Sequence, residues 1–437
     1  MGAYLDKPVT TKESFDGLYV NIEGDAEHAF AVSEMQGWRK TMEDAHITKH
    51  GIAEVDGEPV SVFGVFDGHG GKEVAAFCAQ HLTEELVELE SFRKGDFERA
   101  LPEVFHQMDN MLRSEAYASE LSKLRDQDDA VSSSAENHAS DQDDEDEAND
   151  EGASGASAKD PPSRESIQAD VKEKMDAAEQ KGSLTKAEAL ELVMKMMKLK
   201  SMDEEQASEG NAAQDGAAVG ARYTDAGCTA VVCLLHGPRI FVANAGDSRA
   251  ILSTNGTARA LSQDHKPSQD RELKRIRAAG GFVNEAGRVN GNLNLSRSIG
   301  DLKYKVNEDL DPADQIITAE PDVRVFELTD EDEFFFIACD GVYDVMTNQR
   351  AVDFVFERLA KGVQPVSTIL EEVFEECICD SPQAAQGLGA DNMTACLVLL
   401  KPLSYFPAHA ASHQKKSATG SRSKSSRLFR TKSRHKT

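Results

Sequence analysis

The feature that most constrains the fold of this chain is a set of apolar, β-prone runs that each deliver one aspartate into a short turn. The clearest run covers residues 60–66 and ends at Asp67, and a similar run covers residues 334–339 and ends at Asp340. Such runs predict buried strands. Because an unpaired carboxylate is costly to take out of water, converging aspartates imply either arginine partners or divalent cations. Six aspartates lie in turns of this kind: Asp44, Asp67, Asp247, Asp301, Asp340 and Asp391.

The composition indicates a globular body with an acidic surface. The 437 residues, 40% of them hydrophobic, are enough for one large or two ordinary domains. The net charge of -29 argues against nucleic acid as a partner and is compatible with a protein that collects cations. Since the candidate ligands all present oxygen, magnesium or manganese is favoured over zinc.

The cysteine content and the N-terminus bear on location. Seven cysteines and the lack of a signal peptide favour reduced thiols and an intracellular, cytoplasmic protein. No run of eighteen apolar residues predicts a membrane span. Gly2 supplies the glycine that N-myristoylation requires, although Asp6 replaces the usual Ser or Thr. The alternative is an ordinary disordered start.

Two segments, residues 23–114 and 221–402, carry the patterns of one packed α+β domain. An extension, residues 1–22, precedes them. The expected elements include strands at Ala29–Met35 and Val60–Phe66 and helices near Lys72–Leu89, Ala351–Ala360 and Val366–Cys377.

An acidic insertion, residues 115–220, separates the two segments. Residues 126–151 contain twelve Asp or Glu and no Lys or Arg, so this block repels itself and is expected to be disordered. One helix is predicted within the insertion, at Leu184–Leu199. It either docks on the body or a partner, or forms only transiently.

The C-terminal tail, residues 403–437, is expected to be a solvated basic segment, because its last 23 residues hold nine Lys or Arg and no acid. Together with an acylated Gly2, the tail could supply the second signal for peripheral membrane contact. Contact with the acidic insertion and a nuclear address are the alternatives.

Seven short motifs follow one another in the body: Met35–His46, Phe66–Gly71, Gly227–Ala230, Asn244–Ala250, Leu295–Asp301, Cys339–Val345 and Gly389–Thr394. In this order they resemble the metal-dependent protein serine/threonine phosphatases of type 2C (the PPM family). The resemblance covers about Ala29–Arg113 and Tyr223–Leu400. Tyr343 and Cys228 replace a frequent tryptophan and serine, and neither change removes a metal-binding oxygen.

The resemblance implies an α+β fold with four layers in an αββα sandwich, two antiparallel sheets face to face with helices outside each. Residues 265–301 resemble the flap of the family, a loop beside the cleft of the kind that sets substrate choice.

The resemblance also implies two Mg²⁺ or Mn²⁺ ions. Asp67 would bridge them, with the Gly68 carbonyl and Glu43, through water, serving one ion and Asp340 and Asp391 the other. Asp44 is also assigned to the metal site. A weaker third ion would use Asp247 and Asp344 together with Asp340, although Asp247 could instead cap its own turn.

For catalysis, the resemblance assigns Arg39 to the substrate phosphate, which its planar fork of donors suits. Arg39 could instead only neutralise Glu43 or Asp44. His69 is assigned as the general acid for the leaving seryl or threonyl oxygen, or else it only orients Asp67. Groups expected to orient ligands and waters or to form the wall of the site are Asp44, His46, Asp301 and Asn392.

The implied activity is hydrolysis of phosphoserine and phosphothreonine in phosphoprotein substrates, by direct attack of a hydroxide shared between two metal ions. A monomer suffices for this activity. Two other readings are a catalytically inactive scaffold of the same fold and an acidic calcium-buffering protein. The scaffold reading is weakened because every metal-site aspartate is retained, and the calcium reading because the acidic block lacks a glycine-centred ligand loop.

Overall fold

A computed structural model of the chain describes residues 4–20, 27–126 and 224–410. The chain divides into one unit of residues 1–130 and 224–437 and a second unit of residues 131–223, and every element given below belongs to the first. Several predicted features lie outside the described residues: Gly2, the helix at 184–199, the acidic block from residue 127 onward and the basic tail beyond residue 410.

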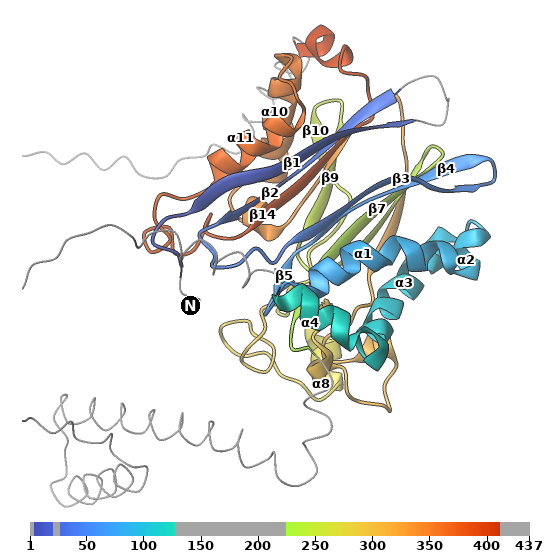
Figure 1. Cartoon of the computed structure of the whole chain (residues 1–437), viewed down its shortest axis with the longest axis vertical. Helices are drawn as coiled ribbons and strands as arrows, with labels where there is room; N and C mark the ends of the chain where they lie inside the picture. Colours follow the sequence, from blue (N-terminus) through green and yellow to red (C-terminus); the bar gives the residue numbers. More distant parts are fainter. Residues whose placement is uncertain (1–3, 21–26, 127–223, 411–437) are drawn as a thin grey trace, which may run out of the picture. The chain divides into compact units, whose positions relative to one another are not determined.

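Two antiparallel sheets form the centre of the first unit (Figure 1). The first sheet has six strands, in the order β1 (Val9–Val20), β2 (Glu27–Gly37), β14 (Met393–Leu399), β13 (Asp332–Ala338), β9 (Arg249–Thr254) and β10 (Thr257–Ala260). The second sheet has five, in the order β12 (Asp322–Glu327), β8 (Arg239–Ala245), β7 (Ala230–His236), β4 (Glu58–Phe66) and β3 (Ala45–Val55).

The apolar inner faces of the sheets pack against each other. Phe63 on β4 makes edge-to-face contacts with Phe30 on β2 and with Phe335 on β13. All seven residues of β13 are buried, because the second face of this strand is covered by helices. Burial on both faces explains why residues 334–338 of this strand are continuously apolar rather than alternating.

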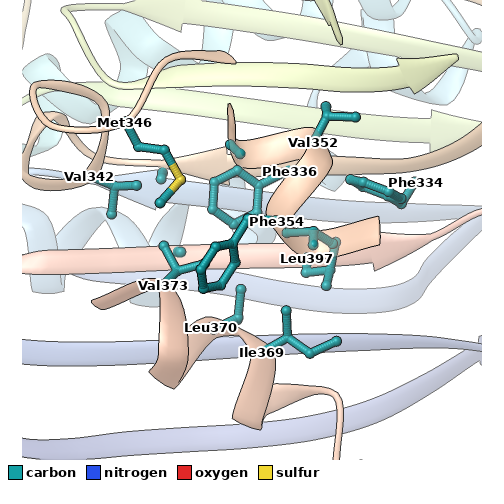
Figure 2. Packing of buried hydrophobic residues seen from close by; sticks show 14 of the residues in the cluster. Phe334, Phe336, Val342, Met346, Val352, Phe354, Ile369, Leu370, Val373 and Leu397 are labelled. Carbon is teal, nitrogen blue, oxygen red and sulfur yellow. The ribbon is translucent and has the colours of Figure 1, made fainter. Parts of the chain in front are cut away.

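Helices cover the outer face of each sheet (Figure 1). On the first sheet, α10 (Asn348–Ala360) and α11 (Ser367–Cys377) form a cluster with the strands, and Figure 2 shows Phe354 and Val373 packed over Phe336 and Leu397. On the second sheet, α1 (Glu73–Glu88) lies against β3 and β4, and α3 (Phe97–Leu112) against β8 and β12. The four-layer αββα sandwich is therefore confirmed.

The remaining elements are short. They comprise α2 (Glu90–Arg93), η1 (Glu115–Tyr117), α4 (Ala118–Asp126), α8 (Asp270–Ala278), η3 (Leu302–Tyr304), η4 (Pro312–Asp314) and α9 (Asp340–Tyr343). A small three-stranded sheet joins β11 (Ile299–Gly300), β6 (Gly227–Cys228) and β5 (Gly68–His69). This sheet brings His69 close to the segments that carry Gly227 and Asp301.

Three boundaries differ from the sequence prediction. Within the predicted extension 1–22, Val9–Val20 forms the edge strand β1, whose polar residues hid the strand pattern because they face solvent and α11. Within the predicted insertion 115–220, Ala118–Asp126 forms α4, which buries Leu121 and Leu124. Within the predicted tail 403–437, residues 405–410 are helical and Phe406 is buried against the first sheet.

The seven cysteines are all free thiols, and every one except Cys379 is buried. Among the described residues, no helix has the length and apolar character that crossing a bilayer requires.

Candidate active site

A cavity of about 300 Å³ opens where strands of both sheets end. Asp67 follows β4 and Asp247 follows β8, and these two strands run in the same direction because each is antiparallel to β7 between them. Asp340 follows β13 and Asp391 precedes β14, its antiparallel neighbour. Strand order therefore brings four carboxylates from distant parts of the sequence to one place. The predicted residues that line the cavity are Arg39, Glu43, Asp67, Gly68, His69, Asp247, Asp340, Asp391 and Asn392.

Close backbone contacts hold the turns that carry these carboxylates. A Cβ atom at Gly68 would lie 2.0 Å from the Glu43 carbonyl oxygen, and one at Gly341 would lie 2.0 Å from the Asn392 carbonyl oxygen. No other residue fits at either position without displacing the backbone. The two glycines therefore let the turns after β4 and β13 pack against the segments that hold Glu43 and Asp391.

Asn392 connects the cavity wall. Its Nδ2 donates to the carbonyl oxygens of Gln36, at 2.8 Å, and Thr41, at 3.0 Å. Its Oδ1 accepts a hydrogen bond from the backbone amide of Glu43 at 3.0 Å, and its backbone amide donates to Asp391 Oδ1 at 2.8 Å. One amide side chain thus fixes Glu43 relative to Asp391.

The carboxylates in and beside the cavity destabilise one another's charged forms. Burial, followed by repulsion from Asp340 and Asp44, raises the pKa of Asp67 well above its usual value. Burial and the neighbouring Asp247 do the same to the pKa of Asp340. Burial raises the pKa of Asp44 to about 7. Clustered acids of this kind call for positive charge in the same place.

Two cationic side chains supply part of that charge. Arg39 Nη2 lies 2.5 Å from Asp391 Oδ2, and Lys266 forms an ion pair with the buried Asp247. Arg39 therefore pairs with Asp391, not with Glu43 or Asp44. The described part of the chain contains no group of three or more His, Cys, Asp or Glu side chains arranged to hold a metal ion.

The donor set nevertheless fits divalent cations. Asp44 Oδ2 and Asp247 Oδ1 are buried and make no hydrogen bond among the described residues, so each retains a lone-pair site without a partner. Among the described residues, Asp67 and Asp340 form no ion pair with a cationic side chain, and burial together with neighbouring acids raises the pKa of both. Hard oxygen donors clustered in this way suit Mg²⁺ or Mn²⁺.

His69 is held by a buried acid. Its Nε2 lies 2.7 Å from Asp301 Oδ2, and that oxygen also accepts a hydrogen bond from Ser298 Oγ at 2.6 Å. Burial alone would lower the pKa of His69, but Asp301 outweighs it and the pKa is raised. The protonated imidazole is therefore favoured at the edge of the cavity.

Four predicted residues do not line the cavity. Asp44 is coupled to Asp67 electrostatically, and Asp301 acts on His69. Asp344 is exposed and is coupled to Lys266 and Asp247. His46 bonds Glu34 Oε1 through Nδ1 at 2.6 Å, so it orients a residue of β2.

Sequence reasoning assigned no role to several residues that take part in the cavity. Lys40, Thr229, Asn294 and Leu295 line it, and Lys266 reaches it as the partner of Asp247. Lys40 could have been predicted from the sequence, because it directly follows Arg39 in the same motif. Lys266 and Asp247 lie in different segments, Asp247 after the end of β8 and Lys266 in a separate loop. No local sequence pattern therefore predicts that they pair.

The four-layer sandwich and the carboxylate cavity at its strand ends agree with the resemblance to the phosphatases of type 2C. A family model described as protein phosphatase 2C matches residues 28–135 and 132–381. The chain belongs to this family, as its resemblance predicted, and is a protein serine/threonine phosphatase.

Individual relatives support the same family assignment. The probable protein phosphatase 2C 21 of Arabidopsis thaliana is 36% identical over 401 residues, which cover 92% of this chain and 93% of the relative. The probable protein phosphatase 2C 3 of Paramecium tetraurelia is 36% identical over 404 residues, covering 92% of this chain and all of the relative. A crystal structure of a phosphatase from a pathogenic strain of Toxoplasma gondii has a TM-score of 0.52 and 19% identity, covers 88% of this chain and 95% of its own, and supports the fold alone.

Proposed function

We propose that this phosphatase hydrolyses phosphoserine and phosphothreonine in proteins by direct attack of water, with two Mg²⁺ or Mn²⁺ ions as cofactors. The observation that carries the proposal is the single cavity at which carboxylates from both sheets converge, and in which burial and neighbouring acids raise the pKa of Asp67 and of Asp340. When bound by such a group, two divalent cations would supply positive charge for the phosphate and would favour deprotonation of the attacking water.

The residues that would hold the cations are those that border the cavity from both sheets. Asp67, the Gly68 carbonyl and Glu43 would serve one ion, and Asp340 and Asp391 would serve the other. Asp247, with the exposed Asp344 beside it, is the candidate for a weaker third ion, and its buried unpaired Oδ1 supports this.

Two side chains act on the substrate. Arg39 is about half exposed at the cavity and presents a guanidinium that can bind two phosphate oxygens at once. His69 donates a proton to the leaving seryl or threonyl oxygen. Since its Nε2 is engaged by Asp301, the proton comes from Nδ1.

The test is release of phosphate from a phosphothreonine peptide by the purified full-length chain in Mn²⁺. We expect turnover that is lost on chelation and restored by Mn²⁺, and an Asp67→Ala variant that is folded but inactive. Folded wild-type protein without turnover in excess Mn²⁺ would instead favour the inactive scaffold.

A further inference from the structure

Glu73 is a buried acid that the proposed mechanism does not use. It is the first residue of α1, six positions after Asp67, and is only 1% exposed. A carboxylate removed from water this completely needs charged or hydrogen-bonding partners. Its partners come from two segments that are far away in sequence.

Both of these segments bind to the same oxygen of Glu73, Oε1. Arg125, near the end of α4, places Nε at 3.0 Å and Nη2 at 2.9 Å from Glu73 Oε1. Thr224 Oγ1 donates to the same oxygen at 2.6 Å. Arg125 and Thr224 lie close to the two ends of residues 127–223, which are outside the described part of the chain. The two ends that flank residues 127–223 therefore meet at one carboxylate.

The second oxygen of Glu73 faces the turn that carries the active-site residues. Oε2 is buried, makes no hydrogen bond among the described residues, and lies where a Cβ on Gly71 would approach it to 2.3 Å. The Gly71 amide donates to Glu43 Oε2 at 3.4 Å, a long contact. Glu73 thus lies against the backbone of Gly71, whose amide donates a hydrogen bond to Glu43.

A second chain of contacts leads from Thr224 to His69. The Ala226 amide donates to Thr224 Oγ1 at 3.1 Å, and the Ala226 carbonyl accepts from the Asp301 amide at 3.0 Å. Asp301 in turn holds His69. A displacement of Thr224 would therefore shift both the turn at Gly70 and Gly71, through Glu73, and the proposed general acid His69, through Asp301.

The turn itself has little intrinsic rigidity. Gly70 and Gly71 both have positive φ, at 72° and 141°, so their positions depend on surrounding contacts rather than on side-chain sterics. We propose that Glu73 is a positioning residue of the active site, which couples the chain segments at Arg125 and Thr224 to the turn of Asp67, Gly68 and His69. Any partner or modification that displaces either segment would change this turn. The inference rests on the proposed roles of Asp67 and His69.

The test compares Glu73→Ala, Glu73→Gln and Arg125→Met in the full-length chain. We measure kcat and KM on a phosphothreonine peptide, Mn²⁺ affinity by calorimetry, and thermal stability. For Glu73→Ala we expect losses of about tenfold in kcat and in Mn²⁺ affinity, with KM for the peptide unchanged. Glu73→Gln keeps an acceptor for Thr224 and should recover part of both losses.

Glu333→Gln is the matched control. Glu333 is also buried and accepts from a hydroxyl, Ser253 Oγ at 2.6 Å, and from a backbone amide, that of Gly256 at 2.9 Å. It lies at the end of β13 opposite to Asp340. We expect this variant to lose stability while kcat and Mn²⁺ affinity stay at the wild-type values.

Folded Glu73→Ala protein with wild-type kcat and Mn²⁺ affinity would overturn the inference. If Glu73→Ala does not fold, Arg125→Met and Thr224→Val decide, and wild-type values of both parameters in both variants would overturn it equally. An inactive wild type would refute the proposed function instead, and Mn²⁺ affinity would still test the role of Glu73.

Discussion

Asp301 shows how one residue can set the chemistry of another without touching the cavity. It lies in the left-handed backbone region, at φ 50°, and is 2% exposed. Burial opposes the charge of Asp301, but His69, followed by Ser298 and Lys305, outweighs it and lowers the pKa of Asp301. The negative charge that results is what keeps the proton on His69.

Replacing Asp301 by Asn should therefore alter the pH dependence of turnover. Without the carboxylate the pKa of His69 falls, so the protonated acid is lost at lower pH. We expect the alkaline limb of the kcat profile to move to lower pH, measured on a phosphothreonine peptide. Ser298→Ala, which keeps the charge, should produce a smaller displacement. An unchanged alkaline limb in Asp301→Asn would contradict His69 as the acid.

Glu272 provides a test of stability at the residue scale. Burial opposes its charge, but Arg297 and Arg275 prevail and lower its pKa from 4.5 to about 2. The stabilisation is therefore complete above pH 4.5 and is lost as the pH falls from 4.5 towards about 2.

Glu272→Gln should lower the free energy of unfolding by about 3 kcal/mol near neutral pH, because it removes the carboxylate that pairs with Arg275 and with the buried Arg297, which keeps only its ion pair with Asp322. The deficit should shrink as the pH falls through that window, where the wild type loses the same interaction. Denaturant titrations at a series of pH values measure both. A deficit that is constant with pH would show that the charge of Glu272 is not responsible.

At the scale of elements, β1 is the strand with the weakest sequence signal. Its side chains bind to α11 on one face, since Lys12 pairs with Glu375 and Ser14 donates to Glu371. On its other face, Tyr19 is buried and donates to the Leu399 carbonyl. Gly17 lies between these contacts, and the ring of Phe30 occupies the space above it.

Gly17→Ala should consequently destabilise the edge of the first sheet. The added Cβ would lie 2.2 Å from the Phe30 ring, so the ring or the strand must shift. We expect a loss of about 1 to 3 kcal/mol in the free energy of unfolding, measured by chemical denaturation. Thr10→Ala on the same strand, at an exposed position, should change it by less than about 0.5 kcal/mol. Equal effects of the two substitutions would contradict the packing described for β1.

At the scale of the whole molecule, the sequence was informative where local pattern and tertiary environment coincide. The buried strands β4 and β13 and helices α1, α10 and α11 were predicted near their observed bounds, because apolar periodicity reflects burial directly. The aspartates at strand ends were found for the same reason. The pairing of Arg39 with Asp391, and of Arg125 with Glu73, depends on strand order and long-range packing, which no local pattern contains.

Gly2 and the basic tail beyond residue 410 lie outside the described residues, and the predicted membrane contact involves both ends of the chain. If Gly2 is acylated and the basic tail supplies the second signal, the expressed protein should bind vesicles that contain anionic lipid, and binding should weaken with salt. Mass spectrometry of the mature N-terminus measures the modification itself. An unmodified Gly2 would remove the acyl anchor and leave the tail as the only candidate contact.

The distribution of thiols has a practical consequence. No cysteine lines the cavity, and burial raises the pKa of several thiols, Cys339 beside Asp340 among them. Buried thiols with little thiolate react slowly with electrophiles. Iodoacetamide should therefore label Cys379 first and leave turnover intact, which would distinguish this enzyme in a crude extract from phosphatases that attack their substrates with sulfur.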